Sequence, residues 1–503
     1  MKFNREILIV LSIFIMAFAV RIISINYNSK TWDEFMITYT SSNCQVPFNT
    51  FSAFDNKSYN NNNIKSVISS NMRCESGNCL LYNIILYYWS SVFGSSDFAT
   101  RLFSVICGAL VVLFTFLLAK KLFNINVAYI SSAIAIIHPS LIQFGVLTRS
   151  YEFAILLSLI SSFYFVKIFY EKDKKINYFL YAISSIALLF AHYSAFYIIL
   201  VHALFAILFL RDKVKWKNLF ICGVIVLVVF LLWYFIYGYQ GFQLMTQRNE
   251  MWLKEAREFD LWEKVISIKI MILYTYQLYT YLIGDYLHWD MLGWGYKMRY
   301  LALILLIPMA FILLSFKNKK TFELKKISLI LTLGFSCFLL ANILAVKSGH
   351  TLSYSFQYSQ FSVPFIIISL SIGIYEIFFV RNILKYFLFV LFTVYIGVMI
   401  IYDFNTYFVT RNKFFNVIAK KIDNVYEKND TVFYYYFTDA QQTNFHLKSN
   451  KTIIQKVDTS ININKVILRN RNNNREIEIF DFTGGKINRP LIRPLKKKKV
   501  AKL

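Results

Sequence analysis

The sequence predicts an α-helical polytopic membrane protein, and three observations lead to that fold class. Hydrophobic residues make up 57% of the 503 residues, with 50 Phe and 35 Tyr among them. That composition is too apolar for one soluble core. Apolar runs of roughly 20 residues, the length that crosses a bilayer, recur along the chain. Short clusters of Lys and Arg separate these runs, which is typical of membrane-protein loops.

The formal net charge of +26 is compatible with two kinds of partner. A strongly basic chain can bind nucleic acid, but here the Lys and Arg residues lie in short clusters between apolar runs. In that position they act as topology determinants and as contacts for lipid headgroups. The charge therefore predicts membrane lipids as partners and argues against nucleic acid.

The length rule predicts about eleven membrane spans. The first covers residues 7–25, and because no small-residue cleavage site follows it, we expect it to remain as an anchor. The others are residues 100–119, 126–144, 151–170, 177–193, 194–211, 218–237, 298–316, 326–345, 360–380 and 383–402. Together they define a predicted transmembrane bundle over residues 1–402.

The basic clusters also predict the orientation of the bundle. If the spans alternate, clusters such as those at Lys120, Lys172 and Lys213 fall on one side, which the positive-inside rule identifies as the cytoplasm. We therefore expect a multi-pass plasma (inner) membrane protein with a cytoplasmic N-terminus. An odd span count places the C-terminus outside. The outer side also receives a long first loop, 26–99, and a large loop, 238–297, in which residues 248–265 have helical spacing.

The first outer loop has two unlike parts. Residues 49–71 are rich in Asn and Ser and predict a flexible segment. Residues 80–93 are apolar but too short to span, so they predict an interfacial helix, with a re-entrant segment as the alternative.

Three cysteines lie in this loop, on the oxidising side: Cys44, Cys74 and Cys79. One disulfide is expected among them; a Cys74–Cys79 bond would close a small turn, but the spacing leaves the pairing open.

Residues 403–503 are soluble in composition and predict a small α/β module. A helix is expected over residues 411–427, where apolar residues recur with helical spacing. Four strands are expected: Thr431–Phe437, Lys451–Val457, Lys465–Leu468 and Glu476–Phe482.

Two adjacent carboxylates, Asp33 and Glu34, follow the first span and lie close to the membrane surface. Ionisable groups at that depth are costly, and their presence favours a functional role. The alternative is that they cap a short helix after Thr31.

The order and spacing of several motifs resemble one enzyme family. These motifs are Arg21 with Trp32-Asp33-Glu34, residues 81–89 with residues 93–104, His138-Pro139-Ser140-Leu141-Ile142 with Thr148-Arg149-Ser150-Tyr151, and Ala191-His192-Tyr193-Ser194-Ala195-Phe196. Over roughly residues 15–400 the chain resembles glycosyltransferase family 39, C-type membrane enzymes that include protein O-mannosyltransferases and aminoarabinose transferases of lipid A.

Two positions depart from the family pattern. Asn78-Cys79-Leu80 stands where many members have Pro-Pro, and Gln357 stands where they have Arg before the late Tyr358. The second departure removes a cation from that position and leaves Lys347 or His350 as substitutes.

The resemblance implies that a sugar, hexose or pentose, moves from a polyprenyl-phosphate donor to a hydroxyl of a lipid, glycan or protein acceptor outside the cytoplasm. Asp33 would be the general base, with Glu34 orienting or tuning it. Direct displacement would invert the anomeric centre. The lipid phosphate leaves as an anion, so cations must stabilise it. The candidates are Arg149, Arg101 and Arg21.

Two of these arginines have structural alternatives. Arg21 could snorkel from the end of the first span, and Arg101 could pair with Asp97 at (i, i+4). Three further side chains are candidates to line the cavity: Tyr151, His192 and Tyr358. A lone His at a helix end is, however, more often a structural hydrogen-bonding group.

The sequence demands no cofactor. The two acids are adjacent rather than in a D-x-D pair, and the expected donor has one phosphate, so a divalent cation is compatible with the site but not required. No nucleotide-binding glycine motif is present. The rival function is a flippase or transporter of lipid-linked sugars, which would be favoured by an inverted internal repeat that the sequence lacks.

Overall fold

The computed structural model describes 13 stretches of the chain. They are residues 5–25, 34, 37–38, 40–41, 63–258, 323–347, 360–377, 383–403, 414–425, 430–434, 454–457, 465–470 and 475–481. The described residues form two compact units. One contains the helices up to α18 and the other contains α19 with a β-sheet.

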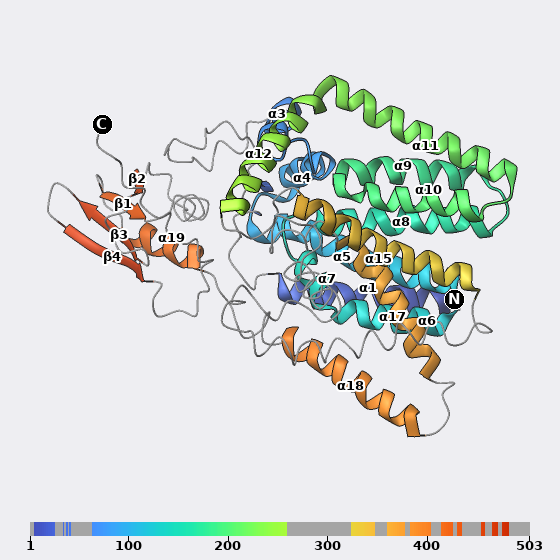
Figure 1. The fold of residues 1–503 in the computed structure, drawn as a ribbon. Helices are drawn as coiled ribbons and strands as arrows, with labels where there is room; N and C mark the ends of the chain where they lie inside the picture. The colour runs from blue at the N-terminus through green and yellow to red at the C-terminus, as the bar shows by residue number, and fades with distance from the viewer. Residues whose placement is uncertain are drawn as a thin grey trace. The chain divides into compact units, whose positions relative to one another are not determined.

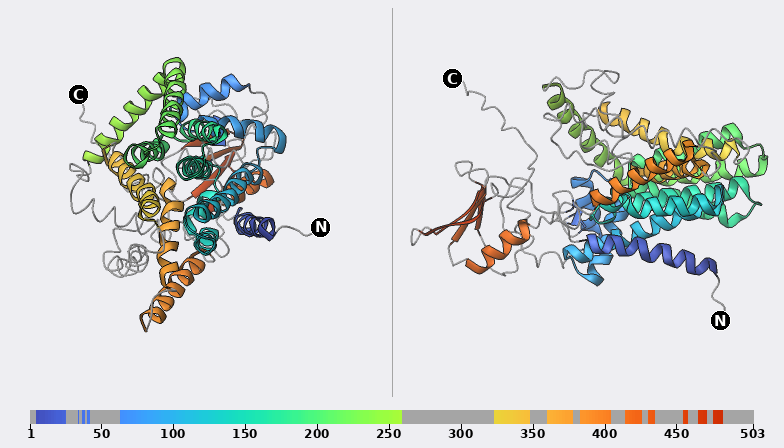
Figure 2. Two further views of the ribbon diagram at one scale, coloured as in Figure 1. Left: turned by 90° about the vertical axis from the view of Figure 1, so that its right-hand side faces the viewer. Right: turned by 90° about the horizontal axis from the view of Figure 1, so that it is seen from below.

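The first unit is a bundle of apolar helices (Figure 1). Its helices include α1 (Arg5–Ser24), α5 (Asp97–Leu122), α6 (Ile125–Ile137), α7 (Pro139–Gly145), α8 (Tyr151–Tyr170), α9 (Lys175–Ala191), α10 (Phe196–Phe209), α11 (Lys213–Trp233), α15 (Leu324–Lys347), α17 (Val363–Ile377) and α18 (Ile383–Asp403). α5 packs against α1, α6 and α8, and α17 packs against α6 and α15. The helices are seen nearly end-on in the left view of Figure 2.

These helices confirm the predicted fold class. Ten of the eleven predicted spans coincide with described helices or, for residues 126–144, with a helix pair, and α8 has the predicted bounds. The remaining predicted span, 298–316, lies outside the described residues. By length and composition, five helical segments of the described chain could cross a membrane, or six if α6 and α7 count as one span.

The span predicted over residues 126–144 is not straight. α6 and α7 meet at a bend of 60° between Ile137 and Pro139. Proline has no amide hydrogen for the helical ladder, and its ring clashes with the carbonyl one turn earlier, so the bend begins at Pro139. The length rule missed this break because both halves are apolar.

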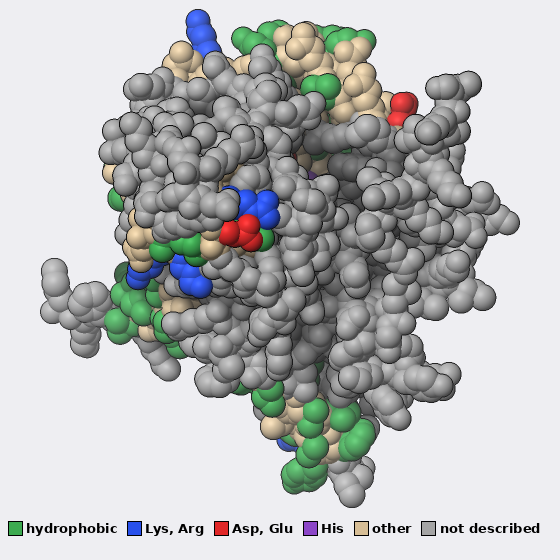
Figure 3. All heavy atoms as spheres, turned by 90° about the vertical axis from the view of Figure 1, so that its left-hand side faces the viewer, with side chains coloured by type: hydrophobic (Ala, Val, Ile, Leu, Met, Phe, Trp, Pro, Cys, Tyr) green, Lys and Arg blue, Asp and Glu red, His purple; other side chains and the backbone are tan. Residues whose placement is uncertain are grey.

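Burial separates the centre of the bundle from its surface. Of the spanning windows, the one over Gln360–Ile377 in α17 is 94% buried, whereas the one over Lys213–Gln247 is 11% buried. α17 is therefore the interior helix of the bundle, and α11 presents its apolar side chains outward, as a lipid-facing helix does. On the face shown in Figure 3, hydrophobic side chains gather at the lower edge, and acidic and basic side chains lie together near the middle.

The first outer loop contains two helices. α4 (Leu80–Phe93) has the bounds predicted for the interfacial helix. α3 (Ile64–Cys74) overturns part of the flexible segment predicted over residues 49–71. It forms because the Asn63 side chain caps it by accepting from Ser66 N and because Val67 lies on a buried face. Residues 49–62 lie outside the described part of the chain.

The large outer loop does not begin at residue 238 as expected. α11 continues through a π-helix, η3 (Tyr234–Gly238), into α12 (Tyr239–Glu258). Helical structure thus runs without interruption from Lys213 to Glu258. It includes part of the helix predicted over residues 248–265, and the rest of the loop lies outside the described residues.

Lysine side chains pair with acidic residues where α1 begins and where α5 and α8 end. Lys120 Nζ lies 3.0 Å from Glu6 Oε1. Lys121 pairs with Glu171, and Lys215 Nζ donates to the Glu171 carbonyl over 2.6 Å. The basic clusters of the first spans therefore lie at one end of the bundle, as the alternating spans predicted.

The second unit has the elements predicted for the C-terminal module. α19 (Phe414–Val425) accompanies a four-stranded sheet of β1 (Asp430–Tyr434), β2 (Ile454–Val457), β3 (Lys465–Asn470) and β4 (Arg475–Asp481). The strand order is β2-β1-β3-β4, with β1 parallel to β2 and the other neighbours antiparallel. Ile418 and Ile422 of α19 are fully buried, as are Val432 and Leu468 of the sheet.

Candidate functional site

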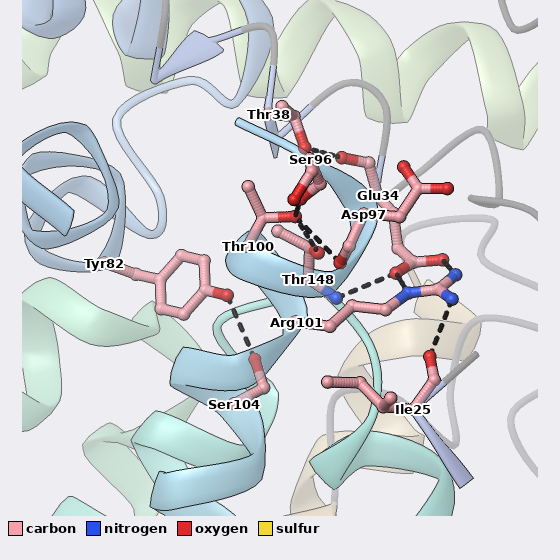
Figure 4. Close-up of polar contacts among 10 residues, drawn as sticks. All are labelled: Ile25, Glu34, Thr38, Tyr82, Ser96, Asp97, Thr100, Arg101, Ser104 and Thr148. Atoms are coloured by element: carbon pink, nitrogen blue, oxygen red, sulfur yellow. Dashed lines mark hydrogen bonds and ion pairs between the residues drawn. The ribbon is translucent and has the colours of Figure 1, made fainter. Parts of the chain in front are cut away.

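Glu34 is held inside the bundle by three hydrogen bonds (Figure 4). Arg101 of α5 donates Nε to Oε1 over 2.7 Å and Nη2 to Oε2 over 2.8 Å. The Thr148 amide donates to Oε1 over 2.9 Å. Both charged side chains are 0% exposed. A two-pronged Arg–carboxylate pair of this kind fixes orientation as well as distance, so Glu34 has a defined place in the site.

Arg101 connects three segments that are distant in sequence. Its Nη1 donates over 2.9 Å to the Ile25 carbonyl, one of the acceptors that helix α1 leaves unsatisfied at its end. Through Glu34 it reaches Thr148, whose hydroxyl donates to Thr100 Oγ1 over 3.2 Å. Arg101 therefore joins the end of α1, the Glu34 segment and the turn before α8, and its guanidinium is directed at protein acceptors.

Asp33 and Tyr358 lie outside the described residues. Their predicted roles as general base and cavity-lining residue therefore stay predictions.

Arg149 lies beside a carboxylate that the sequence did not identify. Its Nη1 lies 3.5 Å from Glu75 Oε1, and the two side chains are 12% and 16% exposed. On its other side, Nη2 donates to the Tyr151 hydroxyl over 2.8 Å, and the guanidinium carbon lies 5.0 Å from the centre of the Tyr151 ring. Arg149 is therefore partly accessible to solvent and is oriented from two directions.

A row of neighbouring rings, Tyr151, His192 and Phe361, begins beside Arg149. The Tyr151 ring lies 6.0 Å from the His192 ring, which lies 5.3 Å from the Phe361 ring in η4 (Gln360–Ser362). The structure thus links three predicted site residues: Arg149, Tyr151 and His192. Beside Phe361, the Gln360 amide and the Ser362 hydroxyl are buried, and no described residue forms a hydrogen bond with either of them. Sequence reasoning missed both, because short polar residues at the start of an apolar span give no distinctive pattern.

The turn over residues 75–79 forms one side of this site. Ser76 and Cys79 have the positive φ angles of 55° and 61°, which are uncommon for residues other than glycine. Asn71 Nδ2 donates to the Asn78 carbonyl over 2.7 Å, and the Tyr193 amide donates to Asn78 Oδ1 over 2.9 Å. The turn is therefore fixed to helix α3 and to η2 (Tyr193–Ala195).

Cys79 is a free thiol, so the structure does not contain the Cys74–Cys79 bond considered from the spacing. Its Sγ lies 2.9 Å from Ser150 Oγ, because the left-handed backbone at Cys79 directs the side chain toward the turn before α8. Burial, more than the nearby charge of Glu75, raises the pKa of the Cys79 thiol to about 12. The positions of Cys44 and of the Cys74 side chain lie outside the described part of the structure.

Arg21 does not snorkel to the membrane surface. It is 0% exposed, and its Nη1 and Nη2 donate to the carbonyls of Ala17 and Ala135 over 3.2 and 3.4 Å. Two glycines leave space for it. A Cβ on Gly108 would lie 2.6 Å from Arg21 Nε, and one on Gly145 would lie 2.9 Å from the same atom.

Glu152 is the acidic neighbour of Arg21 in the interior. It is 0% exposed, and no described residue donates a hydrogen bond to its oxygens. A Cβ on Gly108 would lie 3.2 Å from its Oε1. The Glu152 side chain therefore lies within the bundle.

Among the described residues, no three His, Cys, Asp or Glu side chains are grouped so that they could hold a metal ion. Asp33 is outside that set, so the compatibility of the site with a divalent cation stays a prediction.

Sequence comparison finds a match to one family model over part of the chain. Residues 79–235 match the family model described as dolichyl-phosphate-mannose-protein mannosyltransferase. The resemblance to glycosyltransferase family 39 is thereby confirmed for the segment from the turn at residues 75–79 to α11. No curated protein matches the chain.

A solved structure shares the fold of this chain, and two others are similar to it at lower TM-scores. The apo structure of ArnT from Cupriavidus metallidurans has a TM-score of 0.51 at 10% identity, covering 90% of this chain and 86% of that one. ArnT bound to undecaprenyl phosphate gives a TM-score of 0.49 at 11% identity, covering 90% and 85%. The apo oligosaccharyltransferase of Archaeoglobus fulgidus gives 0.47 at 14% identity, covering 83% of this chain and 58% of that protein. This chain thus spans little more than half the length of the oligosaccharyltransferase. The bundle has the polytopic fold of C-type membrane glycosyltransferases.

Proposed function

We propose that this chain, whose residues 79–235 match the mannosyltransferase family, is a membrane glycosyltransferase that moves one sugar from a polyprenyl-phosphate donor to an acceptor hydroxyl. The family description names a dolichyl-phosphate-linked sugar, which supports a lipid-phosphate donor. The acceptor hydroxyl attacks the anomeric carbon, the lipid phosphate leaves with the bonding electrons, and the anomeric centre inverts. The acceptor is a lipid, a glycan or a protein, and the sugar is a hexose or a pentose.

The observation that carries this proposal is the anchoring of Glu34. Both of its oxygens already accept hydrogen bonds, from Arg101 and from the Thr148 amide. A carboxylate committed in this way is a poor acceptor for a further proton. The two adjacent acids then divide the work: Asp33 removes the proton of the attacking hydroxyl, and Glu34 positions the segment that carries it.

Arg149 is the arginine that the geometry favours for the leaving phosphate. It is partly exposed, and a planar guanidinium can give two donors to one phosphate. Arg101 and Arg21 are fully buried and donate to Glu34 and to backbone carbonyls. For these two we propose a positioning role in place of the phosphate contact expected from the sequence.

The reaction as proposed needs no metal, because Arg149 can neutralise the single phosphate of the donor. Chelation of divalent cations should therefore leave transfer by the purified protein largely unchanged. A chelator-sensitive rate that returns on adding Mg²⁺ or Mn²⁺ would contradict this part of the proposal.

The experiment that tests the function is sugar transfer from a labelled polyprenyl-phosphate donor by purified Asp33→Asn protein. Asn keeps the shape of the side chain but cannot take the proton, so the rate should fall about 10² to 10⁴-fold while thermal stability stays near the parental value. If Asp33 only capped a helix, Asn would serve nearly as well. Near-parental turnover would therefore remove Asp33 from the mechanism.

Glu34→Gln cannot serve as a mild control, because it also weakens the pair with Arg101. The acceptor is identified separately, by mass spectrometry of the envelope lipids and glycans of a deletion strain. One missing sugar supports the transferase, whereas an unmodified lipid redistributed between leaflets supports the flippase.

For the membrane topology we propose a cytoplasmic N-terminus and an extracytoplasmic C-terminal unit. Reporter fusions at Asp173 and Asn318 should then give inside signals, and a fusion at Asp430 should give an outside signal. An inside signal at all three positions would mean that the span count is wrong by one.

A further inference from the structure

A negative charge lies within the site that we assign to the leaving phosphate. Glu75 Oε1 is 3.5 Å from Arg149 Nη1, and both side chains are mostly buried. A carboxylate so close to the proposed phosphate ligand lowers the attraction of the site for any anion. A site selected only for tight phosphate binding would not be expected to place an acid there.

The fixed turn keeps Glu75 near Arg149. The Glu75 amide donates to the Asn71 carbonyl over 2.9 Å, and Cys79 contacts Ser150, the residue after Arg149, over 2.9 Å. The segments that carry the two charges are thus joined at a second point. The Arg149 side chain is also held by Tyr151, so its orientation does not depend on Glu75 alone.

The charge of the lipid phosphate changes during the proposed reaction. In the donor the phosphate is a diester with one negative charge. When the bond between the anomeric carbon and the phosphate oxygen breaks, the oxygen keeps the electron pair, and the acceptor's proton goes to Asp33. The product is a phosphate monoester, which carries close to two negative charges above its second pKa of roughly 6.

We propose that Glu75 is a specificity-determining residue that favours the singly charged donor over the doubly charged product and so speeds product release. This inference rests on the proposed function. Arg149 attracts the product more strongly than the donor, and the repulsion from Glu75 grows by the same additional charge. The Arg149–Glu75 pair therefore lets the site hold the donor without retaining the spent lipid.

The test compares two lipids on three proteins at pH 8, where the monoester is almost fully ionised. The lipids are polyprenyl phosphate and its methyl ester, a diester with one charge. The proteins are the parental chain, Glu75→Gln and Glu75→Asp, and binding is measured by thermal shift in detergent. Gln keeps the hydrogen-bond acceptor for Arg149 but removes the charge, and Asp keeps the charge.

Glu75→Gln should bind the monoester roughly ten-fold more tightly relative to the diester than the parental protein does, since one unit of charge repulsion is removed. Glu75→Asp should keep the parental ratio. In turnover, Glu75→Gln should show stronger inhibition by added polyprenyl phosphate and a lower kcat, with KM for the donor unchanged or reduced.

Two outcomes overturn the inference. A monoester-to-diester ratio that is the same in Glu75→Gln and the parental protein would show that Glu75 does not discriminate. Equal weakening of both lipids would show that it only positions Arg149. If instead the parental protein binds neither lipid, the proposed function itself fails. Because the binding measurement needs no turnover, these failures are distinguishable.

Discussion

Two arginine–carboxylate pairs lie near the same turn of the bundle, and they differ in contact distance and in burial. Arg101 and Glu34 form two contacts of 2.7 and 2.8 Å, and both side chains are 0% exposed. Arg149 and Glu75 are 3.5 Å apart and are 12% and 16% exposed. The two pairs are in contact with adjacent residues of this turn. The Thr148 amide donates to Glu34, and Arg149 lies beside Glu75.

The difference indicates that one pair stabilises the turn and that the other pair is the one available to a ligand. A sealed pair is costly to break, because either charge left alone in the interior has no water to solvate it. The open pair is 3.5 Å apart and 12% and 16% exposed, so it should contribute less to stability than the sealed pair and can exchange its partner for a ligand. The sealed pair therefore holds the turn in place, and the open pair is the part of it that an anion can reach.

The largest expected effect comes from breaking the sealed pair. Arg101→Met leaves Glu34 buried without its cation, which should lower the free energy of unfolding by about 3–5 kcal/mol. Thermal unfolding in detergent measures this loss. The double variant Arg101→Met with Glu34→Leu should recover much of it, because no unpaired charge remains. If the double variant were as unstable as the single one, the pair would not be the source of the loss.

The open pair should show the opposite behaviour. Arg149→Gln should weaken binding of polyprenyl phosphate about 10- to 100-fold, the range for hydrogen bonds to a charged group, with a smaller loss of stability than Arg101→Met causes. Isothermal titration gives the affinity, and thermal unfolding gives the stability. Arg149→Lys keeps the charge but not the planar guanidinium, so its affinity should lie between those of the parental protein and Arg149→Gln. A large loss of stability in Arg149→Gln would place this pair with the sealed one.

Arg21 belongs with the sealed arginines, and its glycine neighbours offer a further test. Gly108→Ala places a methyl group 2.6 Å from Arg21 Nε and 3.2 Å from Glu152 Oε1, and should destabilise the protein by about 1–3 kcal/mol. Gly223→Ala in α11 is the matched control, because nothing lies within 4 Å of its added Cβ. That variant should be neutral or slightly more stable, since alanine favours a helix. Equal changes in stability in both variants would mean that the Arg21 side chain can move away from the added methyl group.

The smallest effect concerns the turn that carries Glu75. Because burial raises the pKa of the Cys79 thiol to about 12, the reactive thiolate is nearly absent at pH 8 and increases only as the pH approaches that value. Alkylation followed by peptide mass spectrometry should leave Cys79 unmodified in the folded protein and modified after denaturation. Rapid labelling of the folded protein at pH 8 would show that the turn opens, and so would weaken the fixed geometry on which the Arg149–Glu75 pair depends.

Local patterns predicted the helices well where length and composition both pointed the same way. α8 and α4 have the predicted bounds, because each is an apolar run ended by charged, small or glycine residues. The bend at Pro139 was missed because the residues on both sides of it are apolar. Helix α3 was missed because its composition is polar. In α3 the cap at Asn63 and the buried Val67 override the composition.

The sequence named candidate site residues but not the pairs that they form. The resemblance placed Glu34, Arg101 and Arg149 among the candidates. Sequence spacing offered only Asp97 as a local partner for Arg101, whereas the structure shows the pair with Glu34, 67 residues away. Glu75 could not be anticipated either, because it lies 74 residues from Arg149. Such distant contacts depend on how the helices pack, which no local pattern contains.

The buried position of Arg21 has a consequence for the assembly of the protein in the membrane. α1 is synthesised before α5 and α7, the helices whose Gly108 and Gly145 make room for Arg21. At the centre of an isolated helix an Arg costs about 2.5–3.5 kcal/mol to insert. Arg21, however, lies in the last turn of a segment with a mean hydropathy of 2.7, where it can reach the headgroups at first. Membrane insertion of α1 and burial of its arginine are therefore two separate events, and the second must wait until α5 and α7 have entered the bilayer.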